Sequence, residues 1–258
     1  MKSDRYKTWL KQADYDLQAA DLSFENGFYE WAAYQSEQTV EKALKGVIVH
    51  AGETSPKIHK LSVLFGMCNS VNAEFRKTKF SFRHIESFGF ITRYPFVIPG
   101  KEGTPHNLIQ RKDAEAGIKE ASAILTKINH ILQKGKQKNG QKMPKSISKE
   151  ELDRRLDEVR DILVREFNPE RIVVFGSYAR EPLPDKLSTI DVLIIAETDL
   201  RFIERIKKAR EVTRGDMPAI EPLMYTPDEF QTLTEREGES FFESALAEGR
   251  EIYPVRKS

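Results

Sequence analysis

A lysine-rich segment divides this chain of 258 residues into two parts of different character. Residues 134–149 read KGKQKNGQKMPKSISK, with six lysines, two glycines, one proline and no acidic side chain. This stretch has too few apolar residues to join a packed core, so it predicts a flexible linker. The alternative is a basic tract that follows RNA phosphates. We therefore expect domains at residues 1–133 and 150–258, joined by a linker at 134–149.

The first domain has the sequence pattern of amphipathic helices. Apolar residues recur at spacings of three and four, as on one face of a helix. The expected helices cover residues 6–26, 31–51, 60–70, 72–90 and 113–133. Short connections between such helices favour an antiparallel bundle. The single cysteine, Cys68, lies in one of these apolar patterns; it excludes an intrachain disulfide and is expected to be a buried thiol.

The second domain alternates helices with short strands rich in β-branched residues. Ser148 and Glu151 form a capping sequence that opens a helix running to about residue 167. The other expected elements are strands at 171–175, 190–195 and 220–225 and a helix at 202–213. This order predicts an α+β domain with a small mixed sheet.

Composition and charge exclude few functions. The formal net charge is +1, which gives no general case for binding to nucleic acid or a membrane. No apolar run approaches the roughly 20 residues that cross a bilayer. The first residues, MKSDRYKTWLKQADYD, carry charges where a signal peptide needs an apolar core. Together with the single cysteine, these features predict a soluble cytoplasmic protein without membrane contact.

The stretch most informative about chemistry is VVFGSYAREPLPDKLSTIDVLII, residues 173–195. Gly176 ends a predicted strand, where it lets a phosphate approach the backbone and the amides of the following turn. Ser177 can donate its hydroxyl, and Arg180 its guanidinium fork, to phosphate oxygens. Asp191 lies among apolar strand residues, where a carboxylate is costly unless it is paired or binds a metal.

The Phe-Gly-Ser-Tyr-Ala-Arg stretch, followed by Ser-Thr-Ile-Asp-Val-Leu-Ile, resembles the signature of the DNA polymerase beta superfamily in its minimal nucleotidyltransferase branch. In that family a Gly-Ser pair holds the triphosphate, and two carboxylates one residue apart on the next strand bind Mg²⁺. A third carboxylate on a later strand completes the site. The resemblance implies that Gly176, Ser177 and Arg180 bind ATP or another nucleoside triphosphate. It assigns metal binding and catalysis to Asp191 and Glu221, with Mg²⁺ as the cofactor.

The chain departs from this family at three positions. Thr189 stands where the first of the paired carboxylates belongs, and Glu181 stands where the family commonly has glycine. Glu221 stands where the family usually has aspartate. A neutral threonine leaves less negative charge to hold two divalent ions, so we expect weak or absent transfer with nucleotide binding retained. Asp185 is the alternative source of the missing carboxylate. The resemblance implies a hydroxyl acceptor, which is a protein tyrosine, a small molecule or RNA.

The first domain resembles the HEPN domain of prokaryotes. The resemblance rests on WAAYQSEQTVEKALK at residues 31–45, on His59-Lys-Leu and on the Thr-Arg-Tyr-Pro of residues 92–95. Members are helical bundles, usually dimeric and often fused to minimal nucleotidyltransferases, which implies a homodimer through the bundle. Many are ribonucleases with an Arg-x4-6-His motif, but no arginine here has a histidine at that spacing. Two alternatives to an active transferase stay open: a degenerate nucleotide-binding and dimerisation module, or a HEPN ribonuclease toxin with a fused antitoxin-like domain.

Polar residues of the first domain have two interpretations each. Arg93 and Tyr94 are candidates for lining a groove of the bundle, whereas the alternative for Arg93 is a helix-end arginine bonded to carbonyls. Glu37, Gln38 and Glu41 share one helix side with two lysines. We expect these three to form a solvated or dimer-facing stripe and not a catalytic set.

Overall fold

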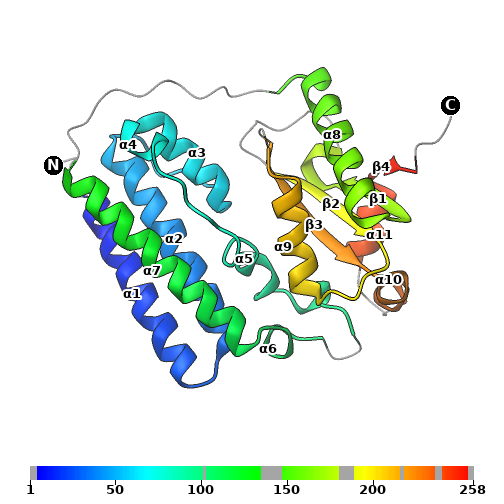
Figure 1. Ribbon diagram of the computed structural model, residues 1–258, viewed down its shortest axis with the longest axis horizontal. Helices are drawn as coiled ribbons and strands as arrows, with labels where there is room; N and C mark the ends of the chain where they lie inside the picture. The colour runs from blue at the N-terminus through cyan, green and yellow to red at the C-terminus, as the bar shows by residue number, and fades with distance from the viewer. Residues whose placement is uncertain are drawn as a thin grey trace. The chain divides into compact units, whose positions relative to one another are not determined.

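The computed structural model describes residues 5–100, 103–134, 147–179, 189–215, 218–235 and 240–254. The chain forms two compact units, and each is described by itself (Figure 1). Unit 1 comprises Met1–Pro95 and Thr104–Met143, and unit 2 comprises Phe96–Gly103 and Pro144–Ser258. The predicted fold classes are confirmed: an N-terminal helical bundle and a C-terminal α+β region with a four-stranded mixed sheet. In the described ranges, no helix has the length and apolar character needed to cross a membrane.

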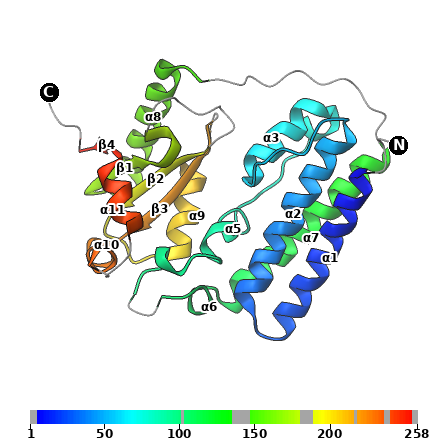
Figure 2. The same cartoon turned by 180° about the vertical axis from the view of Figure 1, so that it is seen from behind.

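Three long helices form the frame of unit 1. They are α1 (Arg5–Glu25), α2 (Tyr29–His50) and α7 (Arg111–Lys134), which pack against one another (Figures 1 and 2). Small residues allow close approach: a Cβ on Gly46 would lie 3.3 Å from side-chain atoms of Trp9 and Leu10. Most of α2 is buried, including residues on its polar side. Helix α2 is therefore the centre of the bundle.

Shorter elements complete unit 1. They are α3 (Leu61–Val71), α4 (Ala73–Arg76), α5 (Phe88–Ile91) and α6 (Pro105–Leu108). A 3₁₀ turn, Pro95–Val97, lies where the chain passes from unit 1 to unit 2. The single helix predicted at 72–90 is wrong. Phe80 and Phe82 both contact the ring of Phe65, with centroids 5.0 and 5.8 Å away. Residues two apart in sequence project from the same side only where the chain is extended. These contacts are therefore incompatible with a continuous helix through Phe80 and Phe82. Cys68 is buried in α3, as predicted.

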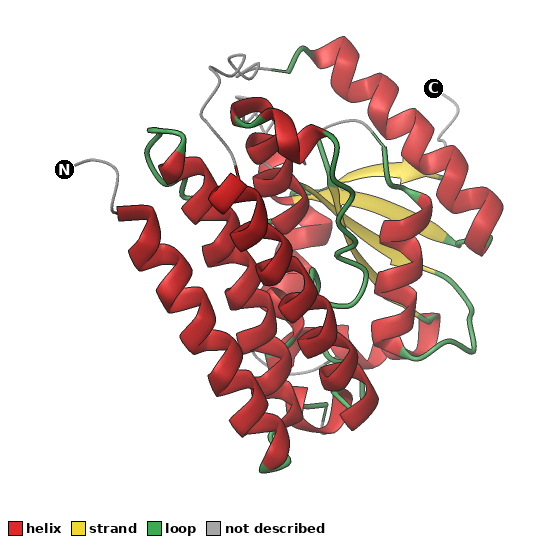
Figure 3. Cartoon of the chain, turned by 60° about the vertical axis from the view of Figure 1, so that its left-hand side comes forward, coloured by secondary structure: helices red, strands yellow, loops and turns green. Residues whose placement is uncertain are grey.

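The sheet of unit 2, whose strands are yellow in Figure 3, has the strand order β3-β2-β1-β4. Its strands are β1 (Arg171–Phe175), β2 (Ile190–Ile195), β3 (Ile220–Tyr225) and β4 (Arg250–Tyr253). Strands β2 and β3 are parallel, and the other neighbouring pairs are antiparallel. The first three strands match the predicted ranges. Strand β4 was not predicted, because its four residues are too few and too polar to stand out.

Helices cover both faces of this sheet. They are α8 (Lys149–Phe167), α9 (Phe202–Val212), α10 (Pro227–Thr234) and α11 (Ser240–Ala247). The predicted Ser148–Glu151 capping box opens α8. Apolar residues of α8 pack with Ile172, Val192 and other strand residues of one face. On the opposite face, Phe242 of α11 contacts the ring of Tyr225 (centroids 5.5 Å apart).

Unit 2 also contains a segment that precedes the lysine-rich stretch by more than thirty residues. Val97 and Ile98, from Phe96–Gly103, are buried. The fully buried Tyr225 donates its hydroxyl to the carbonyl of Val97 at 2.7 Å. The packing of unit 2 therefore includes residues far away in sequence.

Candidate functional site

Two acidic residues lie side by side on β2 and β3. Asp191 is the register partner of Glu221 on β3 and of Phe175 on β1. Register partners on neighbouring strands project from the same face of a sheet. Phe175, Asp191 and Glu221 therefore form a row across three strands, and Gly176 directly follows Phe175. The structure thus brings together three of the predicted site residues.

Gly176 is in direct contact with Asp191. Its φ of 70° lies in the left-handed region, and a Cβ there would be 2.4 Å from Oδ2 of Asp191. Both facts require glycine at this position. Gly176 opens the 3₁₀ turn Gly176–Ala179, in which Ser177 is exposed and Tyr178 is buried. The turn with the exposed Ser177 hydroxyl therefore directly adjoins the Asp191 carboxylate.

Glu221 has a partner that the sequence analysis missed. The guanidinium of Arg210, on α9, forms an ion pair with the Glu221 carboxylate. Their side chains are 12% and 21% exposed, so the pair is largely shielded from solvent. A protein cation therefore neutralises the charge of Glu221. No motif marks Arg210, because its role depends on the packing of a helix beside β3.

Other positions of the predicted site contribute differently. Thr189 lies directly before β2 and is half-buried, and its side chain supplies no carboxylate. Arg180, Glu181 and Asp185 lie outside the described residues, so the phosphate-binding role of Arg180 stays a prediction.

The donor set limits which metal arrangement fits. Within the described part of the chain, no group of three His, Cys, Asp or Glu residues could hold a metal ion. Mg²⁺ commonly binds through one or two carboxylates together with substrate phosphates. Asp191 fits that mode, whereas the carboxylate of Glu221 is already paired with the guanidinium of Arg210, whose positive charge disfavours a cation beside it. The described residues therefore fit one Mg²⁺ accompanying a nucleotide and do not fit a pair of ions.

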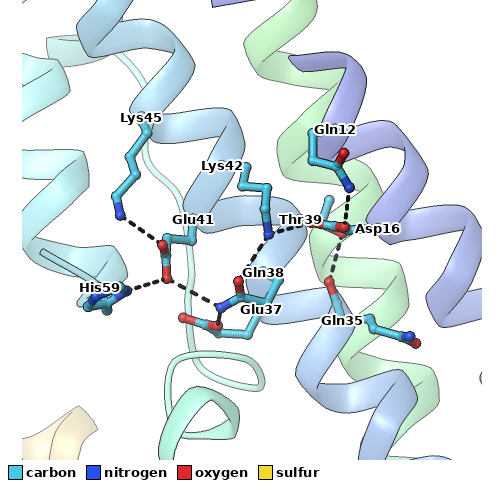
Figure 4. Close-up of polar contacts among 10 residues, drawn as sticks. All are labelled: Gln12, Asp16, Gln35, Glu37, Gln38, Thr39, Glu41, Lys42, Lys45 and His59. Atoms are coloured by element: carbon cyan, nitrogen blue, oxygen red, sulfur yellow. Dashed lines mark hydrogen bonds and ion pairs between the residues drawn. The ribbon is translucent and has the colours of Figure 1, made fainter. Parts of the chain in front are cut away.

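Unit 1 contains a polar cluster along α2 (Figure 4). Glu41 accepts from Lys45 Nζ at 2.8 Å and contacts Nδ1 of His59 at 3.1 Å. Gln38 donates to Glu37 at 2.9 Å. The prediction of a solvated or dimer-facing stripe is wrong, because Glu37, Glu41 and Lys45 are only 3–5% exposed within unit 1 itself. The central position of α2 buries even its polar side, where charged groups then pair with one another.

Glu37 is the most perturbed acid of this cluster. Burial, with a further contribution from the Glu41 carboxylate, raises the pKa of Glu37 to about 8. The carboxylate lies against α5, where a Cβ on Gly89 would be 3.0 Å from Cδ of Glu37. Below pH 8 Glu37 is therefore mainly a neutral, hydrogen-bonded acid.

Arg93 lies at the end of α5. Its Nε donates to the carbonyl of Gly89 at 2.5 Å, as predicted for a helix-end arginine. The guanidinium also lies over the rings of Tyr34 and Tyr94, 5.6 and 5.3 Å from their centroids. Arg93 and Tyr94 are both exposed. Their role in lining a groove stays a prediction.

Comparison with known proteins identifies both halves. The family model of the HEPN domain matches residues 6–131, and that of the nucleotidyltransferase domain matches residues 156–239. The chain is a HEPN domain fused to a nucleotidyltransferase domain. Gly176, Ser177, Asp191 and Glu221 all lie within the nucleotidyltransferase domain.

Several relatives match about half of the fusion protein. It is 29% identical over 136 residues to "Putative toxin MJ1304" of Methanocaldococcus jannaschii, and the match covers 49% of this chain and 87% of that protein. The crystal structure of TT1696 from Thermus thermophilus is 24% identical, covers 49% of this chain and 98% of its own, and has a TM-score of 0.43. ST0689, an archaeal HEPN homologue, is 25% identical, with 50% and 98% covered and a TM-score of 0.37.

Replacing Gly176 tests its contact with Asp191. Gly176→Ala is expected to lower the free energy of unfolding by about 2–3 kcal/mol, because a Cβ meets the carboxylate in a strained backbone conformation. Urea unfolding measures the change. Gly27→Ala is the control, since Gly27 has φ 82° but nothing within 4 Å of its Cβ position, and a loss of about 1 kcal/mol is expected. Adding Asp191→Ala should recover much of the Gly176→Ala loss; equal losses in the single and double variants would contradict the contact.

The raised pKa of Glu37 predicts a pH dependence. Folding favours the protonated acid, so stability is complete below about pH 4.5 and is lost as the pH rises through about 8. Glu37→Gln should remove this loss and be more stable than wild type at pH 9 by about 2 kcal/mol or more. Urea unfolding at pH 5 and 9 measures it. Glu41→Gln, which breaks a buried ion pair with Lys45, should destabilise at both pH values. A wild-type stability independent of pH between 5 and 9 would contradict a neutral Glu37.

Proposed function

We propose that the nucleotidyltransferase domain binds a nucleoside triphosphate, such as ATP, together with one Mg²⁺. The observation that supports this most strongly is the contact of Gly176 with the Asp191 carboxylate. The contact places the Gly176–Ala179 turn, with its unobstructed backbone and the exposed Ser177, directly beside the carboxylate of Asp191 on β2. These are the groups that hold a triphosphate and its accompanying ion.

Each residue has a distinct part in the proposed site. Gly176 carries no side chain, so a phosphate can approach the backbone there. Ser177 donates its hydroxyl to a phosphate oxygen, and Arg180 adds a guanidinium donor by resemblance to the family. Asp191 holds the ion, whose charge offsets that of the phosphates.

We propose that binding, and not rapid nucleotidyl transfer, is the main function of this domain. A general base must be able to accept a proton from the attacking hydroxyl. The carboxylate of Glu221 is already paired with Arg210, and Thr189 provides no second metal-binding carboxylate. Residual transfer would go to a hydroxyl of a protein tyrosine, a small molecule or RNA. It is expected to be slow.

Calorimetric titration of ATP into the intact protein, with and without Mg²⁺, tests the proposed site. Ser177→Ala and Asp191→Asn are expected to weaken Mg²⁺-dependent ATP binding at least about tenfold, since each loses a contact to a charged group worth about 1.5–3 kcal/mol. Ser177→Thr, which keeps the hydroxyl, and Asp199→Asn, which changes an exposed carboxylate outside the site, are the controls. Absence of ATP, GTP, CTP and UTP binding to the wild type would refute the proposal.

A second candidate function concerns the HEPN domain. The relative named as a toxin suggests a toxin-type activity, with the nucleotidyltransferase domain as an antitoxin-like partner. The exposed Arg93, stacked on two tyrosine rings, offers a surface on which RNA bases can stack. A homodimer through the bundle belongs to this proposal.

Single-stranded RNA incubated with the intact protein tests the second candidate. It predicts cleavage without added metal that is lost in Arg93→Ala, because stacking on the guanidinium positions the RNA. Gel analysis of end-labelled RNA measures cleavage. Because an antitoxin-like domain would suppress cleavage by the intact protein, residues 1–133 alone are tested beside it, and RNA that stays intact with both would exclude this function.

A further inference from the structure

The ion pair between Arg210 and Glu221 differs in its location from two other ion pairs of α9. Arg205 pairs with Glu229 at the start of α10, and Lys208 lies 3.6 Å from Glu166 of α8. These two link α9 to neighbouring helices. Arg210 instead reaches β3, at the strand position whose register partner is Asp191.

This location puts a fixed positive charge beside the proposed nucleotide site. Neighbouring strands lie about 4.8 Å apart, so Glu221 is within one strand spacing of Asp191. The side chain of Arg210 is only 12% exposed, which limits screening of its charge by water. Arginine keeps its charge in proteins, and its fork of N–H donors suits both carboxylate and phosphate oxygens.

The net charge of the site favours binding of a single divalent ion. Among the described residues of the site, the carboxylates of Asp191 and Glu221 and the guanidinium of Arg210 sum to one net negative charge. Thr189 adds none. A site with so little negative charge disfavours two divalent cations. The phosphates still require positive charge, and the Arg210 guanidinium is a protein cation at this position.

We propose that Arg210 takes the place of a second metal ion in this nucleotidyltransferase domain. Its guanidinium neutralises Glu221 and provides positive charge for the phosphates, so that the site takes only one divalent ion. The inference rests on the proposed nucleotide binding. It makes Arg210 a positioning residue that determines the metal content of the site.

Mn²⁺ titration followed by electron paramagnetic resonance tests this inference on the intact protein. Mn²⁺ shares the preference of Mg²⁺ for oxygen ligands. With saturating ATP, one Mn²⁺ per chain is expected to bind the wild type. Without nucleotide, Arg210→Met is expected to bind Mn²⁺ at least about tenfold more tightly than wild type, because the substitution removes the positive charge beside Asp191 and Glu221. Lys208→Met, on the same helix, should leave Mn²⁺ binding unchanged.

A second variant covers the case in which Arg210→Met does not fold. Glu221→Gln keeps Arg210 and removes the negative charge that offsets its guanidinium, so ATP binding without Mg²⁺ should become at least about fivefold tighter. Two Mn²⁺ ions per bound ATP in the wild type would overturn the inference. So would unchanged Mn²⁺ affinity in a folded Arg210→Met protein. If the wild type binds no nucleotide, the proposed function fails, and the nucleotide-free Mn²⁺ titration still decides the role of Arg210.

Discussion

The contact between Gly176 and the Asp191 carboxylate determines the arrangement of the nucleotidyltransferase site. It exists because the antiparallel pairing of β1 and β2 sets Phe175 opposite Asp191, so that the next residue meets the carboxylate. A side chain at position 176 would separate the turn from the strand. With glycine there, the exposed hydroxyl of Ser177 and the Asp191 carboxylate come from adjoining segments held by the sheet. In this account, phosphate binding and ion binding therefore both depend on the close approach of Gly176 to the Asp191 carboxylate.

The second determinant of the site is electrostatic. The parallel pairing of β2 and β3 places two carboxylates side by side, which is unfavourable unless positive charge offsets them. Arg210 provides that charge from α9. Position 189 is a threonine and adds no carboxylate to bind a metal. The ion pair with Arg210 then offsets the charge of Glu221 on β3. A threonine in place of an acid at position 189 and an arginine paired with Glu221 thus both reduce the negative charge of the site.

The sequence predicts the local features of this protein well, because they depend on neighbouring residues. The β-branched runs predict β1, β2 and β3, and the Ser148–Glu151 pair predicts the start of α8. The Gly-Ser motif and Asp191 also follow from residues close together in the chain. Their contact agrees with the predicted site, while their roles in binding stay proposals.

Features that depend on distant packing could not be predicted from the sequence. The pairing of Arg210 with Glu221 requires that α9 lies beside β3. The aromatic contacts of Phe65 replace the helix expected at 72–90, and the central position of α2 buries the acids expected in solvent. Val97 joins unit 2 through a hydrogen bond from a tyrosine 128 residues away in sequence. Helical periodicity and charge patterns carry no information about these contacts.

The most direct test of the central claim is a crystal structure of the intact protein with Mg²⁺ and a non-hydrolysable ATP analogue. The account predicts that the phosphates contact the Gly176–Ser177 turn, with one Mg²⁺ on Asp191 and with Arg210 still paired to Glu221. A nucleotide bound elsewhere would contradict the proposed site. Two ions held between Asp191 and Glu221, with Arg210 displaced, would contradict the role assigned to that arginine.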